Sequence, residues 1–234
     1  MNIVITGASS GVGFESVLEL TGLGSHKVVA LARSEDKLRK LQELALALNP
    51  ECFLYCAKFD IVHDDYETRL VPFIKERIGT VDVLINNAGS LISKPFMEIS
   101  QLDFAEMLQN NLLGHVKMIQ NIVPLMSRKS HIVNIGSMGA FQGSEKFPGL
   151  AAYSSSKASL HILTECLAVE LADREISVNC LALGSAQTEM LEKAFPDYQS
   201  PVMAFEMGKY IADFALTGHK FFNGKIIPVA HNTP

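Results

Sequence analysis

The sequence predicts a single α/β domain over residues 1–234, built on one doubly wound parallel β-sheet with helices on both faces. Short runs of β-branched and apolar residues alternate with longer segments of helical period, which is the pattern of repeated βαβ units. A chain of 234 residues is long enough to bury a sizeable core in one domain. No internal repeat, linker or low-complexity tract divides the chain.

Seven apolar runs are the expected strands, and they span residues 3–5, 28–32, 53–56, 83–86, 132–135, 177–181 and 225–229. The expected helices lie near residues 12–23, 35–48, 65–78, 101–126, 152–172 and 203–216. Ser34 is suited to cap the start of the second helix, and Asn49 followed by Pro50 is suited to end it.

Composition argues against several classes of function. The chain has 20 Lys and Arg residues against 25 Asp and Glu, so its net charge is −5, and no basic run is longer than Arg128-Lys129. A nucleic-acid binder needs clustered cations, so we expect no nucleic-acid partner. No uncharged apolar stretch is long enough to span a membrane, and the chain runs directly into the first strand without a signal-peptide pattern. We therefore expect a soluble, cytoplasmic protein.

The cysteines give no sign of a metal site or a disulfide framework. Cys52, Cys56, Cys166 and Cys180 lack the C-x-x-C and Cys/His spacings of metal ligands, and each lies in an apolar segment. We expect reduced thiols and no bound metal.

A glycine-rich turn follows the first strand and leads into a helix. Gly7 permits a tight turn, Gly11 allows close approach of a pyrophosphate, and Gly13 lets the helix pack against the strand. The helix amino terminus would hold the phosphates. No Lys follows the glycines, which disfavours a nucleoside-triphosphate loop. The candidate binding residues of this turn are Gly7, Ser9, Ser10, Gly11, Val12 and Gly13.

The spacing T-G-x-x-x-G-x-G and four further motifs resemble the short-chain dehydrogenase/reductase family over almost the whole chain. The further motifs are Asp60 after the third strand, N-N-A-G at residues 86–89, a Ser after the fifth strand, and Y-x-x-x-K at Tyr153 and Lys157. The resemblance implies a Rossmann fold that binds a nicotinamide dinucleotide. The additional cofactor-binding residues that it implies are Asp60, Ile61, Asn87, Ala88, Gly89, Tyr153, Lys157, Gly184 and Thr188.

Tyr153 and Lys157 are four residues apart on an expected helix, so their side chains share one face. The resemblance implies that Tyr153 is the general acid in carbonyl reduction, and that Lys157 lowers the pKa of Tyr153 and holds the nicotinamide ribose. Ser137 would orient the substrate oxygen. Asn111 would perturb its helix and help to hold a water molecule behind Lys157.

Two other classes of function remain as alternatives. Ser154 and Lys157 also fit the S-x-x-K motif of penicillin-binding proteins, but the companion motifs S-D-N and K-T-G are absent. A dinucleotide-binding regulator of the same fold would not need to retain Tyr153 and Lys157, so their presence favours an enzyme.

The sequence departs from the family pattern around the substrate side. Leu183 replaces the proline expected before Gly184, and the segment from Thr188 to Met203 is short for a substrate lid. We therefore expect a comparatively open active site. A loop at residues 142–149 would border the substrate entrance.

The end of the second strand indicates the cofactor. NAD-binding relatives of this fold carry an acidic residue there, whereas this chain has Ala32 followed by Arg33, whose guanidinium suits a 2′-phosphate. We therefore expect NADP(H) to be preferred over NAD(H).

The substrate is expected to be a small carbonyl compound or alcohol, with a 3-oxoacyl chain on a carrier protein as the nearest specific possibility. The resemblance implies that Arg128, Lys129 and Arg174 would meet such an acidic carrier, and solvated helix ends are the alternative for these three residues. Charged residues make up only 19% of the chain and hydrophobic residues 48%, so more surface than usual is covered. We expect a homodimer or homotetramer, and the resemblance implies that the helices at 101–126 and 152–172 form the interface; ordinary burial within one subunit is the alternative. The apolar positions that suggest this are Leu160, Ile162, Leu163, Leu167, Ala168, Val169 and Leu171.

Overall fold

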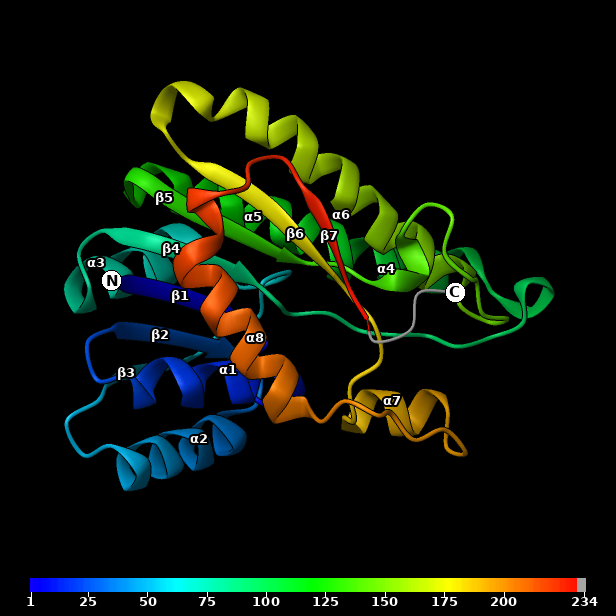
Figure 1. Ribbon diagram of the computed structural model, residues 1–234, viewed down its shortest axis with the longest axis horizontal. Helices are drawn as coiled ribbons and strands as arrows, with labels where there is room; N and C mark the ends of the chain where they lie inside the picture. The colour runs from blue at the N-terminus through cyan, green and yellow to red at the C-terminus, as the bar shows by residue number, and fades with distance from the viewer. Residues whose placement is uncertain (231–234) are drawn as a thin grey trace.

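The computed structural model describes residues 1–230, and a seven-stranded parallel sheet forms its centre (Figure 1). The strands are β1 (Asn2–Thr6), β2 (Lys27–Ala32), β3 (Phe53–Lys58), β4 (Val81–Asn86), β5 (Met126–Ile135), β6 (Ser177–Leu183) and β7 (Ile226–Val229). Their order across the sheet is β3-β2-β1-β4-β5-β6-β7, and every pairing is parallel. The strand order therefore reverses between β1 and β4, where doubly wound sheets bind their ligands at the carboxyl ends of the strands.

Helices cover both faces of the sheet (Figure 1). They are α1 (Gly11–Gly22), α2 (Glu35–Leu48), α3 (Val71–Arg77), α4 (Gln101–Leu108), α5 (Gly114–Ile122), α6 (Ala151–Glu170), α7 (Glu189–Ala194) and α8 (Ala204–Thr217). One hydrophobic core joins α1, α2 and α8 to the sheet, and a second joins α3, α5 and part of α6 to the other face. This arrangement confirms the predicted fold class.

Local signals placed most helix ends correctly. The hydroxyl of Ser34 accepts a hydrogen bond from the backbone N–H of Lys37 and caps α2, which ends at Leu48 before Asn49. By contrast, the helix expected at 101–126 is interrupted. One turn of π-helix at Gln109–Leu113 separates α4 from α5, and β5 begins at Met126, six residues earlier than the sequence pattern suggests. Met126 pairs with Val81 before the strand register shifts, so tertiary pairing extends this strand beyond its apolar run.

Candidate active site

The glycine turn is locked to the segment that follows β4. The side-chain nitrogen Nδ2 of Asn87 donates hydrogen bonds to the carbonyl oxygens of Thr6 (3.0 Å) and Gly7 (3.1 Å). Gly7 and Gly11 have φ angles of +70° and +57°, which favour glycine. A Cβ atom on Gly13 would overlap the side-chain amide of Asn87 and lie 2.6 Å from the carbonyl oxygen of Gly7. The backbone here leaves no room for side chains, as a turn that receives a pyrophosphate requires.

A cavity of about 940 Å³ runs along the carboxyl ends of the strands. All the cofactor-binding positions expected from the sequence line it: Gly7, Ser9, Ser10, Gly11, Val12, Gly13, Arg33, Asp60, Ile61, Asn87, Ala88, Gly89, Tyr153, Lys157, Gly184 and Thr188. Ser137 lines the same cavity, whereas Asn111 is fully buried outside its lining. The volume and the glycine cradle fit a dinucleotide cofactor together with a small substrate.

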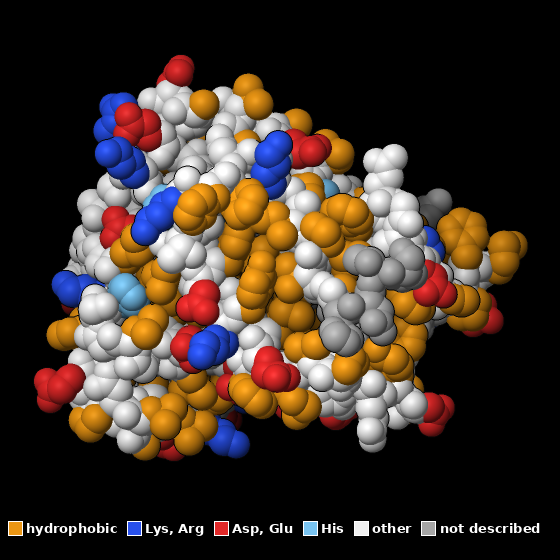
Figure 2. All heavy atoms as spheres, in the orientation of Figure 1, with side chains coloured by type: hydrophobic (Ala, Val, Ile, Leu, Met, Phe, Trp, Pro, Cys, Tyr) orange, Lys and Arg blue, Asp and Glu red, His pale blue; other side chains and the backbone are white. Residues whose placement is uncertain are grey.

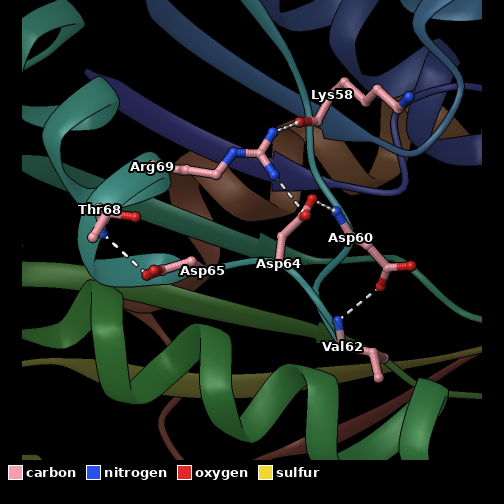
Figure 3. Close-up of polar contacts among 7 residues, drawn as sticks. All are labelled: Lys58, Asp60, Val62, Asp64, Asp65, Thr68 and Arg69. Atoms are coloured by element: carbon pink, nitrogen blue, oxygen red, sulfur yellow. Dashed lines mark hydrogen bonds and ion pairs between the residues drawn. The ribbon is translucent and has the colours of Figure 1, made fainter.

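Asp60 lines this cavity, in a loop held by polar contacts (Figure 3). Its backbone N–H donates to the carboxylate of Asp64 (2.7 Å), which also pairs with Arg69 (2.6 Å). One carboxylate oxygen of Asp60 accepts a hydrogen bond from the N–H of Val62 (2.9 Å), and within residues 1–230 the other has no hydrogen-bond donor. That oxygen is available to an amino group such as the one on adenine.

Lys157 is 4% exposed and lies on α6 among apolar and neutral groups. Its ammonium donates a hydrogen bond to the carbonyl oxygen of Ile135 at 2.7 Å, and no carboxylate pairs with it in the described part of the chain. Burial disfavours the charged form and lowers the pKa of Lys157 from 10.5 to about 8. The site therefore holds a lysine that still carries its proton at neutral pH.

Tyr153 lies one helical turn before Lys157 and faces the same cavity. Burial raises the pKa of Tyr153 above its usual value, and hydrogen bonding with Ser137 offsets this only in part. The ammonium of Lys157 donates to the carbonyl of Ile135, and its expected effect on the pKa of Tyr153 stays a prediction. The phenol stays protonated at neutral pH, as a general acid must.

Asn111 lies in the turn of π-helix between α4 and α5, so the expected perturbation of the helix is present. Its side-chain nitrogen donates to the carbonyl oxygen of Ser90 and to the hydroxyl of Ser156, both at 3.0 Å. A Cβ atom on Gly89 would lie 3.0 Å from the side-chain oxygen of Asn111 and 3.4 Å from the ammonium of Lys157. The two residues therefore converge behind Gly89.

Two buried histidines near Lys157 were not among the expected site residues. His115 is fully buried, and neither ring nitrogen has a hydrogen-bond partner in residues 1–230. Burial, together with the nearby charge of Lys157, lowers the pKa of His115 to about 3. The same two causes contribute to lowering the pKa of His161 to about 4. His161 follows Lys157 by four residues, so helical spacing alone could have indicated it. No comparable local signal marks His115.

The segment after β6 contains a short helix. The hydroxyl of Thr188 accepts a hydrogen bond from the backbone N–H of Leu191 and caps α7, a helix that the sequence pattern did not reveal. Phe195 follows this helix and meets Phe147 edge-on, with ring centroids 6.3 Å apart. The hydroxyls of Ser185 and Tyr198 lie 3.0 Å apart. The segment is therefore structured, and the comparatively open active site stays a prediction.

The basic residues expected to meet a carrier protein lie outside the lining of the cavity. Arg128 and Lys129 lie near the start of β5, whereas Ser137 follows the end of that strand, and the two ends of a ten-residue strand are far apart. Arg128 pairs with Glu175 at 3.0 Å, and Arg174 donates to the carbonyl oxygen of Val123 at 2.8 Å. A contact of these residues with a carrier protein stays a prediction.

The described residues do not have the arrangement of a metal site or of an S-x-x-K hydrolase. Among residues 1–230, no cluster of His, Cys, Asp and Glu has the arrangement of a metal site, and no helix is long and apolar enough to cross a membrane. Ser154, the nucleophile of the S-x-x-K alternative, does not line the cavity. Lys157 contacts the backbone of Ile135 rather than that hydroxyl, so the arrangement does not activate a serine.

Fold and site together define an oxidoreductase built to bind a nicotinamide dinucleotide. The model of the short chain dehydrogenase family matches residues 1–199. The chain therefore belongs to the short-chain dehydrogenase/reductase family, whose members bind a nicotinamide dinucleotide and interconvert alcohol and carbonyl groups.

Two curated relatives illustrate the similarity. An uncharacterized oxidoreductase of Staphylococcus saprophyticus is 32% identical over 189 residues, which cover 80% of this chain and 79% of the relative. The 3-oxoacyl-(acyl-carrier-protein) reductase FabG of Staphylococcus epidermidis is 30% identical over 238 residues, which cover 97% and 96%.

Solved structures share the fold at lower identity. An NADPH-bound short chain oxidoreductase of Pseudomonas aeruginosa with an atypical catalytic centre superposes with a TM-score of 0.86 at 22% identity, covering 99% of this chain and 97% of that one. A 3-ketoacyl-(acyl-carrier-protein) reductase of Brucella melitensis complexed with NADH gives a TM-score of 0.83 at 21% identity, covering 97% and 96%.

Proposed function

We propose that this chain is an NADP(H)-dependent oxidoreductase that reduces a carbonyl group to an alcohol, or oxidises the alcohol, with Tyr153 as the general acid or base. The observation that carries the proposal is the position of Tyr153, Lys157 and Ser137 on the wall of the same cavity that the glycine turn lines. Asn111 supports Lys157 from behind through its contacts with Ser90 and Ser156.

Ser137, Tyr153 and Lys157 have different roles in the proposed reaction. The nicotinamide, when bound, supplies the hydride for reduction. The hydroxyl of Ser137 orients the substrate oxygen, and the hydroxyl of Tyr153 gives its proton to that oxygen as the carbon receives the hydride. Lys157 binds the ribose with its ammonium. Burial raises the pKa of Tyr153, so at neutral pH the phenol carries the proton that reduction requires.

The NADP(H) preference rests on the end of β2. Ala32 is 6% exposed there and offers no carboxylate, and the exposed guanidinium of Arg33 lines the cavity. A 2′-phosphate would find a planar, permanently charged donor in Arg33 and no repelling acid at position 32. Neighbouring structures carry NADPH in one case and NADH in another, so the local residues are the better guide.

The 3-oxoacyl thioesters are the first substrates to test, because a relative that matches almost the whole chain carries the name of a 3-oxoacyl reductase. We also propose that the protein works in the cytoplasm as a homodimer or homotetramer. Exposed apolar side chains on α6 and α4 support an assembly, notably Ile162 (61% exposed), Val169 (77%) and Leu102 (82%). Hydrophobic side chains are also exposed on the face of the molecule shown in Figure 2.

The test follows oxidation of NADPH with a panel of ketones, aldehydes and 3-oxoacyl thioesters. Tyr153→Phe is expected to lower kcat by about 10² to 10⁴-fold while NADPH affinity stays within a few-fold, because the ring remains and only the proton donor is lost. Tyr210→Phe, on the exposed side of α8, is the matched control. A Tyr153→Phe variant that retains more than about a tenth of kcat would overturn the general-acid assignment.

A further inference from the structure

Two aromatic side chains meet across the substrate side of the cavity. Phe147 lies in the loop between β5 and α6, and Phe195 follows α7. Their rings are edge-on, with centroids 6.3 Å apart and an interplanar angle of 63°. Both side chains line the cavity. An edge-to-face pair of this kind offers further apolar ring surface to a third group that enters beside it.

The surroundings of this pair are apolar. Leu91, Met138, Leu150, Met190 and Ala194 line the same cavity as Tyr153. Met138 and Leu150 are 8% and 5% exposed, so they form a closed wall.

Charge is distributed unevenly along the cavity. Its charged lining residues are Arg33, Lys37, Asp60, Glu145, Lys157 and Glu189. Lys37 and Glu189 pair with each other at 3.0 Å, Arg33 and Asp60 belong to the adenine side, and Lys157 is buried on α6. The charged residue left on the substrate side is Glu145, which lies two positions before Phe147.

Glu145 has no cation to neutralise it in the part of the chain that the structure describes. The neighbouring ammonium of Lys146 donates to the carbonyl oxygens of Phe141 (2.7 Å) and Ser144 (3.0 Å) and to the Ser144 hydroxyl (2.6 Å). No ion pair of Glu145 occurs in residues 1–230. A substrate carboxylate would therefore meet a like charge at the entrance and an apolar wall beyond it.

We propose that the substrate is an uncharged ketone or aldehyde with an apolar or aromatic substituent, which packs against Phe147 and Phe195 while Glu145 disfavours carboxylates. This inference rests on the carbonyl reduction proposed above and specifies its substrate class. Phe147, Phe195 and Glu145 then act as specificity-determining residues and take no part in proton or hydride transfer. A thioester-bound 3-oxoacyl chain and a free ketone share this chemistry.

Matched substrates separate charge from shape. Ethyl benzoylformate and benzoylformate carry the same ketone and ring and differ in one carboxylate, while ethyl pyruvate keeps the ester and replaces the ring by a methyl group. We expect kcat/KM for ethyl benzoylformate to exceed that for benzoylformate by at least about tenfold. Glu145→Gln is expected to lower the ratio of kcat/KM between ester and acid by at least about threefold, because the negative charge that repels the substrate carboxylate is removed. Glu170→Gln, exposed at the end of α6, is the control and leaves the ratio unchanged.

The aromatic pair is tested with the two esters. Phe147→Ala and Phe195→Ala are expected to lower kcat/KM at least about tenfold for ethyl benzoylformate and less than about threefold for ethyl pyruvate. The reason is that the phenyl ring of ethyl benzoylformate packs against Phe147 and Phe195, whereas ethyl pyruvate has no ring. Phe205→Ala, exposed on α8, is the control. NADPH affinity, measured by fluorescence titration, stays within about twofold in all of these variants.

The outcomes separate this inference from the proposed function. Reduction of benzoylformate as fast as its ester, or equal losses for both esters in the Phe variants, overturns the substrate class while carbonyl reduction stands. Turnover of a 3-oxoacyl N-acetylcysteamine thioester alongside the free ketones supports the shared chemistry. A protein that binds NADPH and reduces no carbonyl in the panel refutes the proposed function, and the substrate class with it.

Discussion

Replacement of Lys157 by Met is expected to abolish activity and at the same time to stabilise the fold. The lysine is 4% exposed, has no carboxylate partner in residues 1–230, and keeps one hydrogen bond to the carbonyl of Ile135. Its pKa falls from 10.5 to about 8 because burial penalises the ammonium. A shift of that size corresponds to about 3 kcal/mol of unfolding free energy lost at neutral pH.

The size of the gain follows from two opposing effects. Met has a similar length and no charge, so it recovers the about 3 kcal/mol, and loss of the hydrogen bond to Ile135 costs about 1 kcal/mol. We therefore expect Lys157→Met to raise the unfolding free energy at pH 7 by about 2 kcal/mol. For a chain of this size this is a rise in Tm of about 4 to 8 °C.

The dependence on pH identifies the cause. The folded pKa is lowered, so between about pH 8 and 10.5 the unfolded chain binds a proton that the folded chain has released. The stability of the wild type rises with pH across this window, and the advantage of the Met variant disappears there. Urea unfolding at pH 7, 8, 9 and 10 measures this directly.

The control is Lys40→Met, which removes an exposed lysine from α2 and should leave the pH dependence unchanged. A Lys157→Met variant that is less stable than the wild type at pH 7, or that keeps the same rise in stability between pH 8 and 10.5, would refute the reasoning. Loss of turnover is expected in either case, because the ribose loses its cation.

Three more outcomes are expected. Arg33→Ala should weaken NADPH binding at least about tenfold with little change for NADH, and equal losses in a titration of both would show that Arg33 does not contact the 2′-phosphate. Gly13→Ala should lower the unfolding free energy by about 1 to 3 kcal/mol and weaken both cofactors, because its Cβ overlaps neighbouring groups; Gly22→Ala, with open space around it, should not. The molar mass from light scattering should be that of a dimer or tetramer, because Ile162 and Val169 are exposed in the single chain; the mass of a monomer at micromolar concentration would contradict this.

Local sequence signals predicted the parts of the fold that depend on local periodicity. The strand cores, the cap at Ser34 and the glycine turn came from short patterns, because propensity, alternation and φ preferences act over a few residues. The extension of β5 to Met126 was missed, since pairing with Val81 decides it. Helix α7 was missed as well, because six residues in an irregular segment give no clear helical period.

The candidate site was also predicted only in part from the sequence. The helical spacing of Tyr153 and Lys157 placed both on one face, and the order of the family motifs indicated the chemistry around them. The environment of these groups was not predictable, since burial depends on everything packed above them. The structure shows the Lys157 ammonium turned to the carbonyl of Ile135, and burial raises the pKa of Tyr153.

The sequence by itself determined the class of sheet, the glycine turn and the helical spacing of Tyr153 and Lys157, because each depends on a few neighbouring residues or on the order of motifs. Only the tertiary structure decided which distant segments meet. It brought Phe147 to Phe195 and placed Arg128 at the opposite end of β5 from Ser137. Contacts of this kind depend on the path of the whole chain and on the water it excludes, and no local pattern encodes either.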